Sequence, residues 1–351
     1  IVKEALDHKM ILKDATPYNI QFVSGRPILI DTLSFEKYDE SKPWIAYRQF
    51  CETFLFPILV SQYTTLDISK IFLAYPEGIP ANVTAGMLPF QSKFNLGNWL
   101  HVFMPSSMKP GKKGGEISFN KTKLLRIVRH LGEMISSAKR YTHKNSTWSN
   151  YYNETILSNE YLEAKKKIVS EFVSQTDGSF VIDLGSNDGV FAELLAGKTE
   201  VVAADADENC INALYNSIKK TGKNILPLCI DLMNPPSDSG WNNEERKSFM
   251  KRSQANLVLA LALIHHLCIG KNVSWERLVS FFSLAKKWLI IEFVPKEDEK
   301  AQQLLSFRQD VFHNYDQEKF ESAFKKSFEI ITKKEVEGSV RTIYLMKRSR
   351  S

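Results

Sequence analysis

The sequence has few cysteines and no long hydrophobic run, and both absences narrow the classes of protein that it can encode. Its four cysteines lie far apart and form no Cys-x-x-Cys pair. This argues against a zinc or disulfide framework and favours free thiols in a reducing compartment. No stretch approaches the roughly 18 apolar residues that cross a bilayer, so we expect a cytoplasmic protein without a transmembrane segment. Because the first residue is Ile1 rather than methionine, the sequence leaves open whether residues precede it.

A dense basic stripe is also absent. The formal net charge of +6 comes from lysines and arginines scattered along 351 residues, whereas nucleic-acid-binding proteins concentrate basic side chains on one face or helix. We therefore expect no nucleic-acid partner. A chain of this length can bury two cores of ordinary size, so two domains are expected. The oligomeric state is not indicated by the sequence.

The second half of the chain alternates strand-length apolar runs with segments of helical pattern. The apolar runs lie at residues 180–184, 200–204, 225–230, 256–263 and 288–294. The helical segments include residues 207–220 and 274–287. Strands that alternate with helices form parallel sheets whose two faces are both covered.

Two further strand-like segments close the chain. Residues 328–336 and 341–348 are separated by only a short turn, which predicts an antiparallel hairpin. The predicted fold class is therefore α/β, with a Rossmann-like seven-stranded sheet that is mostly parallel and ends in a C-terminal antiparallel hairpin. Residues 146–351 would form this domain, and residues 1–145 would form a mainly helical N-terminal or accessory domain.

The stretch FVIDLGSNDGVFAELL, residues 180–195, predicts a strand, a tight glycine turn and the start of a helix. It does not fit the dinucleotide fingerprint Gly-x-Gly-x-x-Gly, because Asn187 and Val190 stand where the second and third glycines belong. No Gly-Lys-Ser/Thr of a phosphate loop follows. Asp183 and Asp188 flank the turn, where carboxylates repel a pyrophosphate but attract the cationic sulfonium and ammonium groups of S-adenosylmethionine.

Two more acidic residues follow the next two apolar runs. Asp205 ends the second run, 20 residues after Gly185, where a carboxylate can accept hydrogen bonds from both ribose hydroxyls. Asp231 ends the third run and is placed to accept a hydrogen bond from an adenine amino group. The alternative for both residues is a turn or helix-cap role.

The motifs VIDLGSNDG, VVAAD and LPLCID, in this order, resemble those of the class I S-adenosylmethionine-dependent methyltransferases. The likeness extends over about residues 180–347, with ANLVLALALIHHL and WLIIEF as the fourth and fifth strands. It implies S-adenosylmethionine as the cofactor, with ribose at Asp205 and adenine at Asp231. The remaining cofactor contacts that it implies come from the first motif, namely Asp183, Gly185, Ser186, Asn187 and Gly189. Asn187 departs from the glycine that many members carry, but a small polar residue adopts the left-handed conformation at modest cost.

Candidates for a catalytic base are sparse. His265, with His266 beside it, follows the fourth apolar run at the edge where open α/β sheets bind ligands, and a histidine titrates near neutral pH. Glu292, inside the fifth run, is the second candidate. The alternatives are a helix cap or packing role for the histidines and a buried hydrogen-bonding role for Glu292. We predict no metal site, because adjacent histidines chelate poorly on a strand or a helix.

The N-terminal segment LKDATPYNIQFVSGRPILIDTLSFE weakly resembles the C-terminal lobe of a kinase-like or aminoglycoside-phosphotransferase-like fold. In that resemblance Asp14 would be the catalytic base, and Asn19 and Asp31 would bind metal. However, Leu12 and Lys13 stand where His-Arg is usual, and thirteen residues before Asp14 are too few for an ATP-covering lobe. We therefore expect a truncated, degenerate remnant without phosphotransfer by this chain alone. The alternative is an unrelated turn–strand segment.

Together these features predict an enzyme, an S-adenosylmethionine-dependent methyltransferase that acts on a small-molecule or glycan acceptor. Oxygen is the expected acceptor atom. The Asn/Asp-Pro-Pro-Tyr/Phe signature of amino-group methylation is absent after the fourth strand, where ALIHHL stands. Two alternatives stay open: a non-catalytic scaffold that keeps the methyltransferase fold, and a bifunctional protein whose kinase-like half is completed upstream. The acceptor itself is not identified by the sequence.

Overall fold

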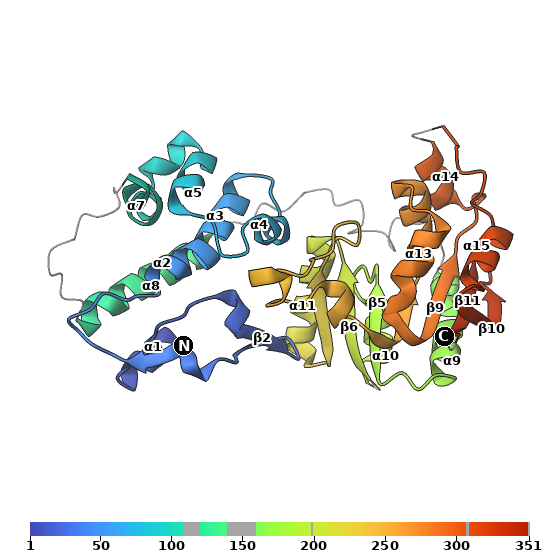
Figure 1. The fold of residues 1–351 in the computed structure, drawn as a ribbon, viewed down its shortest axis with the longest axis horizontal. Coiled ribbons are helices and arrows are strands. Elements are labelled where there is room, and N and C mark those ends of the chain that lie inside the picture. The colour runs from blue at the N-terminus through green and yellow to red at the C-terminus, as the bar shows by residue number, and fades with distance from the viewer. Residues whose placement is uncertain (108–119, 139–158, 198, 307–308, 350–351) are drawn as a thin grey trace. The chain divides into compact units, whose positions relative to one another are not determined.

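The structure is a computed structural model that describes residues 1–107, 120–138, 159–197, 199–306 and 309–349 (Figure 1). Tertiary contacts divide the chain into two compact units. The first comprises Ile1–Phe22 and Pro27–Lys144, and the second comprises Val23–Arg26 and Asn145–Ser351. Each unit has its own hydrophobic core.

The second unit is built on one seven-stranded sheet with the strand order β10-β11-β9-β8-β5-β6-β7 (Figure 1). The strands are β5 (Phe180–Leu184), β6 (Glu200–Asp205), β7 (Ile225–Cys229), β8 (Ala255–Ala260), β9 (Ala285–Phe293), β10 (Phe328–Glu335) and β11 (Thr342–Arg348). Strands β5 to β9 run parallel, whereas β11 is antiparallel to β9 and β10 is antiparallel to β11. The predicted Rossmann-like sheet with a C-terminal antiparallel hairpin is therefore confirmed.

The carboxyl ends of the parallel strands meet at one edge of this sheet. Leu184 of β5 pairs with Ala204 of β6, and Asp205 at the end of β6 pairs with Cys229 of β7. Strand β8 runs parallel on the other side of β5. The loops after β5, β6, β7 and β8 therefore start side by side, and this brings the glycine turn and the acidic strand ends together.

Helices cover both faces of the sheet. They are α9 (Asn159–Ser174), α10 (Val190–Leu195), α11 (Glu208–Thr221), α12 (Phe249–Arg252), α13 (Trp275–Phe281), α14 (Glu299–Leu305) and α15 (Gln317–Phe324), with a π-helical turn at His266–Gly270. Successive strand residues point to opposite faces. Val181 accordingly packs in one core with α9, α10 and α11, and Ile182 packs in the other core with α13 and α15.

Strand β8 is shorter than the apolar run from which it was predicted. That run spans residues 256–263, but β8 ends at Ala260. Ala262 adopts a left-handed backbone conformation with φ of +50°, which an extended strand does not contain. Residues 261–263 therefore leave the sheet and form a loop at its carboxyl edge.

The segment predicted as a helix over residues 274–287 is helical only in its first half. Helix α13 ends at Phe281, and a short 3-10 turn follows it. From Ala285 the chain enters β9, where Ala285 pairs with Ala255 of β8. The helical prediction was wrong in this part, because pairing with a buried neighbouring strand outweighs the helical propensity of alanine and lysine.

The first unit is mainly helical. Its helices are α1 (Val2–Asp7), α2 (Tyr47–Phe50), α3 (Phe56–Tyr63), α4 (Ile68–Ala74), α5 (Ala81–Met87), α6 (Leu96–Asn98), α7 (Met104–Ser107) and α8 (Lys121–Ser137), with π-helical segments at Cys51–Leu55 and Trp99–Phe103. Two strand pairs accompany them, β1 (Met10–Leu12) with β4 (Phe35–Lys37) and β2 (Ile20–Val23) with β3 (Arg26–Leu29). In neither unit does a described helix have the length and apolar character needed to cross a membrane.

The three residues of the kinase-like resemblance make hydrogen bonds within the first unit. Asn19 donates from Nδ2 to Ser34 Oγ over 2.9 Å, and Ser34 donates in turn to Asp31 Oδ2 over 2.6 Å. Asp14 Oδ1 accepts a hydrogen bond from Gln49 Nε2 over 2.7 Å. Within the described ranges, no three or more His, Cys, Asp or Glu residues come together in a group that could hold a metal ion.

Candidate functional site

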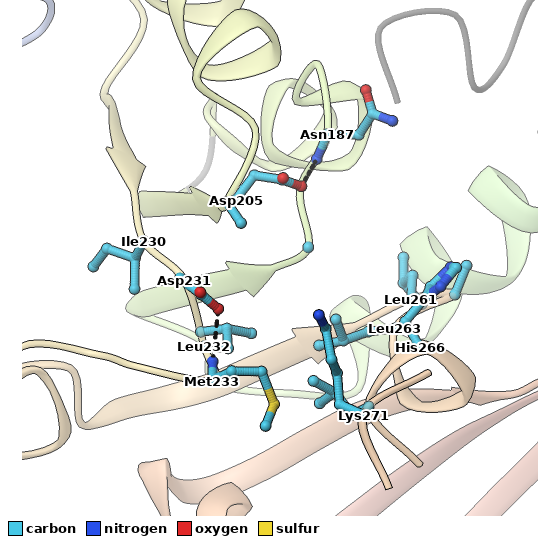
Figure 2. A pocket seen from close by; sticks show the side chains of 14 residues that line it. Asn187, Asp205, Ile230, Asp231, Leu232, Met233, Leu261, Leu263, His266 and Lys271 are labelled. Atoms are coloured by element: carbon cyan, nitrogen blue, oxygen red, sulfur yellow. Dashed lines mark hydrogen bonds between the residues drawn. The ribbon is translucent and has the colours of Figure 1, made fainter. Parts of the chain in front are cut away.

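A cavity of about 360 Å³ opens at the carboxyl edge of the second unit's sheet. Its wall is made by four loops, with Gly185 and Asn187 after β5, Asp205 and Ala206 at the end of β6, Ile230 to Met233 after β7, and six residues between Leu261 and Lys271 after β8. Figure 2 shows Asn187 and Asp205 on one side of it and His266, Leu263 and Lys271 on another. Open α/β sheets bind their ligands at this edge.

The glycine turn after β5 depends on left-handed backbone conformations. Gly185, Asn187 and Gly189 have φ values of +73°, +51° and +86°. A Cβ atom at Gly189 would lie 2.5 Å from Cδ1 of Leu214, so a larger residue would require the Leu214 side chain or the turn to shift. Gly189 therefore acts through packing and is not on the cavity wall, whereas Gly185 and Asn187 are.

Asp205 fixes the glycine turn from the end of β6. Its Oδ2 accepts a hydrogen bond from the backbone N–H of Asn187 over 2.8 Å (Figure 2), and its Oδ1 accepts one from the N–H of Asp207 over 2.9 Å. Burial raises the pKa of Asp205, and these two hydrogen bonds oppose that rise. Each carboxylate oxygen has a second acceptor site, so Asp205 retains the capacity to accept from a ligand hydroxyl in the cavity.

Asp231 lies on the cavity wall after β7. Its Oδ1 accepts a hydrogen bond from the backbone N–H of Met233 over 2.9 Å (Figure 2). The side chain is exposed, and the neighbouring Ile230 and Leu232 add apolar surface to the same wall. Asp231 thus stabilises the turn after β7, which is the alternative role that the sequence left open, and it also lines the cavity.

Asp183 and Ser186, two of the predicted cofactor contacts, are buried and do not line this cavity. In the described structure Asp183 Oδ2 and Ser186 Oγ have no hydrogen-bond partner. Burial and the nearby carboxylate of Asp205 raise the pKa of Asp183 to about 7. Buried polar atoms normally have a hydrogen-bond partner. The Asp183 oxygen and the Ser186 hydroxyl could therefore bind a water molecule or a polar, cationic ligand group beside the glycine turn.

His265 and His266 occupy different environments. His266 lines the cavity, whereas His265 is fully buried and neither of its ring nitrogens has a partner among the described residues. The two ring centroids lie 3.9 Å apart. Burial lowers the pKa of both side chains, that of His266 to about 4, so both are neutral at pH 7. Of the two histidines, the structure therefore places His266 and not His265 on the cavity wall.

Glu292, the other predicted catalytic residue, is fully buried in β9 and is not on the cavity wall. Its Oε2 pairs with Lys165 Nζ over 2.6 Å, and its Oε1 accepts a hydrogen bond from the hydroxyl of Tyr161 over 3.0 Å. Although burial opposes it, the charges of Lys165 and Arg341 lower the pKa of Glu292. The side chain is thus an ionised acceptor inside the protein, which is the buried hydrogen-bonding role that the sequence left open.

The sequence did not identify the residues after β8 that complete the cavity. The apolar run predicts a strand through Leu261, Ala262 and Leu263, and nothing in ALALIHHL signals the left-handed conformation of Ala262. Lys271 was not singled out either. Among the described residues it is the only lysine or arginine on the cavity wall, and its Nζ has no hydrogen bond or ion pair with any of them. Its position after Gly270, at the end of the π-helical turn, was its only sequence signal.

No family model matches the chain. The nodulation protein NoeA of Rhizobium meliloti (strain 1021) is 32% identical to it over 357 residues, which cover 99% of this chain and 75% of that protein. The chain belongs to the NoeA family. Because almost the whole chain is covered, membership of the NoeA family extends to both units.

Two of the solved structures similar to this NoeA-family chain are methyltransferases. The N-methyltransferase NodS from Bradyrhizobium japonicum WM9, in complex with S-adenosylhomocysteine, is 10% identical with a TM-score of 0.43, and the match covers 59% of this chain and all of NodS. Magnesium protoporphyrin IX methyltransferase (ChlM) from Synechocystis PCC 6803 is 15% identical with a TM-score of 0.40, over 66% of this chain and 96% of ChlM. The fold assignment rests on the strand order and the glycine turn described above. The chain therefore has the fold of the class I S-adenosylmethionine-dependent methyltransferases.

Proposed function

We propose that this member of the NoeA family binds S-adenosylmethionine in the cavity at the carboxyl edge and methylates a small-molecule or glycan acceptor at oxygen. One observation carries the proposal: Asp205 holds the left-handed glycine turn through the Asn187 N–H and still faces the cavity. This arrangement supports an adenosyl ligand, because a ribose offers two hydroxyls to a carboxylate at the end of the second strand.

The cavity offers a separate group for each part of the cofactor. Asp205 would accept from the ribose hydroxyls and Asp231 from the adenine amino group, while Gly185, on the cavity wall at the turn, would lie beside the methionine part. When bound, S-adenosylmethionine supplies a methyl carbon made electrophilic by the attached sulfonium. The buried Asp183 favours such a cation, because a positive charge placed nearby stabilises the ionised form of its carboxyl.

His266 is the wall residue that suits an oxygen acceptor. An acceptor hydroxyl must lose its proton as the new carbon–oxygen bond forms, and a nearby base assists that step. With a pKa of about 4, the imidazole of His266 is neutral at pH 7, so it can accept a hydrogen bond from the hydroxyl and orient it. The oxygen becomes far more acidic once it is alkylated, so a weak base is sufficient to take the proton.

A non-catalytic scaffold is the second candidate function. It is favoured by the positions of His265 and Glu292, the two residues predicted to be catalytic, which are both buried away from the cavity wall. NoeA is named a nodulation protein, and we propose the same biological process for this chain in either case.

A transfer assay separates these functions. The purified chain is incubated with tritiated-methyl S-adenosylmethionine and cell-extract fractions, and label is measured in protein, nucleic-acid, lipid, glycan and small-molecule pools. We expect label in the glycan or small-molecule pool, its loss in Asp205→Ala, and its retention in Glu200→Ala, which alters an exposed carboxylate at the other end of the same strand. Label only in protein or nucleic acid would contradict the proposed acceptor. Cofactor binding without any transfer would favour the scaffold.

A further inference from the structure

We propose that Glu292 is a positioning residue: it holds the loop after β8 in the shape that makes one wall of the cavity, with Lys165 of α9 as its counter-ion. The inference deepens the proposed function and rests on it for one readout, the affinity for the cofactor. It assigns to Glu292 no contact with the reacting atoms, since the side chain is fully buried and off the cavity wall.

The contact that carries the inference joins Glu292 to Ala262. Glu292 Oε2 accepts a hydrogen bond from the backbone N–H of Ala262 over 2.7 Å. Ala262 is held at φ of +50°, a conformation that is unfavourable for alanine. A hydrogen bond to an ionised carboxylate is stronger than one between neutral groups, so Glu292 supplies the interaction that keeps Ala262 in this conformation.

The conformation of Ala262 determines where its neighbours lie on the wall. Leu261, Ala262 and Leu263 all line the cavity, and Figure 2 shows the two leucines on the side of His266. A Cβ atom built on Gly185 would lie 3.2 Å from Cδ1 of Leu263. Leu263 therefore packs closely against the glycine turn, and a change at Ala262 would move this side chain with respect to Gly185.

A buried network leaves Glu292 little freedom. Lys165 Nζ and the hydroxyl of Tyr161, both on α9, bind its two oxygens. Arg341 Nη1 donates to the Tyr161 hydroxyl over 3.1 Å, and the same guanidinium makes two hydrogen bonds to Asp298, over 2.7 and 2.9 Å. Buried charges are costly unless they are paired, and here each charge has a partner. The network thereby connects α9 to the cavity wall through Glu292.

Two double variants isolate the positioning role. Lys165→Met with Glu292→Gln and Lys165→Met with Glu292→Met both remove the buried ion pair and keep the length of the side chains. Only the glutamine variant retains an oxygen that can accept from Ala262. We expect the glutamine variant to bind S-adenosylhomocysteine within about threefold of the wild type, and the methionine variant to bind it about tenfold or more weakly, because a buried N–H loses its acceptor. Calorimetry measures both affinities.

A control variant uses an ion pair outside this network. Lys333→Met with Glu321→Met removes the ion pair between β10 and α15, which contacts neither Glu292 nor Ala262, so it should lower the thermal unfolding midpoint but leave the affinity for S-adenosylhomocysteine unchanged. Equal affinities of the glutamine and methionine variants would overturn the inference. So would a loss of affinity in the control as large as that in the methionine variant, since Glu292 would then contribute only to general stability.

Amide hydrogen exchange tests the role of Glu292 without a measurement of cofactor binding. The Ala262 amide should be protected in the wild type and in the glutamine variant, and should exchange faster in the methionine variant. If the wild type binds no S-adenosylhomocysteine, the proposed function is contradicted, while the exchange data still decide the role of Glu292. If the methionine variant does not fold, loss of Ala262 protection in the folded glutamine variant would overturn the inference, and retained protection would support it.

Discussion

Asp183 should make the free energy of unfolding depend on pH in a direction opposite to that of an ordinary ion-paired aspartate. Its side chain is 2% exposed, and burial together with Asp205 raises its pKa from 3.8 to about 7. The folded state therefore holds this proton more tightly than the unfolded state. The stabilising contribution is complete below about pH 4 and is lost progressively as the pH rises to about 7. A shift of about three units corresponds to about 4 kcal/mol over that window.

The variant Asp183→Asn tests this value. The amide imitates the protonated acid and cannot ionise, so it should keep the stability that the wild type loses. Urea unfolding between pH 5 and 8 measures both proteins. We expect the stability of the variant relative to the wild type to rise by about 1.4 kcal/mol per pH unit up to pH 7 and to level off above it.

The comparison must be a difference between the two proteins, because other groups titrate in the same range. His265 and His266 have lowered pKa values, so they destabilise the folded state as the pH falls below about 6.5. Their effect is common to the wild type and the variant and cancels in the difference. A difference that is flat from pH 5 to 8, or that falls as the pH rises, would refute the reasoning about Asp183.

Three further predictions concern Gly189, Lys271 and His266. Gly189→Ala should lower the free energy of unfolding, measured in urea, by about 2–4 kcal/mol, because the new Cβ would lie 2.5 Å from Leu214 Cδ1. The control Gly197→Ala places its Cβ in open space and should change the free energy of unfolding by less than about 0.5 kcal/mol. Equal losses in the two variants would contradict the prediction. We expect Lys271, a cation on the cavity wall, to pair with the carboxylate of the methionine part. Lys271→Met should then weaken the binding of S-adenosylhomocysteine by about fivefold in calorimetry but leave the binding of 5′-methylthioadenosine, which lacks that carboxylate, unchanged. Equal weakening of both ligands would contradict this role. His266→Gln should reduce tritiated-methyl transfer by about tenfold or more with S-adenosylhomocysteine affinity unchanged, and undiminished transfer would exclude His266 as the assisting base.

The fold could be predicted from the sequence because the patterns that indicate it lie within short segments of the chain. Strand-length apolar runs alternate with helical segments, and the short turn between the last two runs leaves an antiparallel hairpin as their only simple connection. Parallel pairing then brings the strand ends together, so Asp205 and Asp231 could be placed at one edge without knowledge of any side-chain contact. Both line the cavity.

The details of the cavity could not be predicted, because they depend on contacts between distant residues. Lys165 lies 127 residues before Glu292 in the sequence, and no local pattern links them. The chain after β8 is apolar like the strand itself, so the left-handed turn at Ala262 leaves no trace in residue type. Two adjacent histidines precede the π-helical turn or begin it, and no local pattern indicates that His266 rather than His265 lines the cavity.

The most direct test of the central claim is the binding of S-adenosylhomocysteine to the wild type and to Asp205→Ala, measured by calorimetry with Glu200→Ala as the control. Asp205 is the carboxylate proposed to accept from the ribose, and hydrogen bonds to a charged acceptor contribute about 1.5–3 kcal/mol each. We predict saturable binding to the wild type and to the control, and binding at least about tenfold weaker to Asp205→Ala. Equal affinities for all three proteins, or no binding to the wild type, would contradict the account.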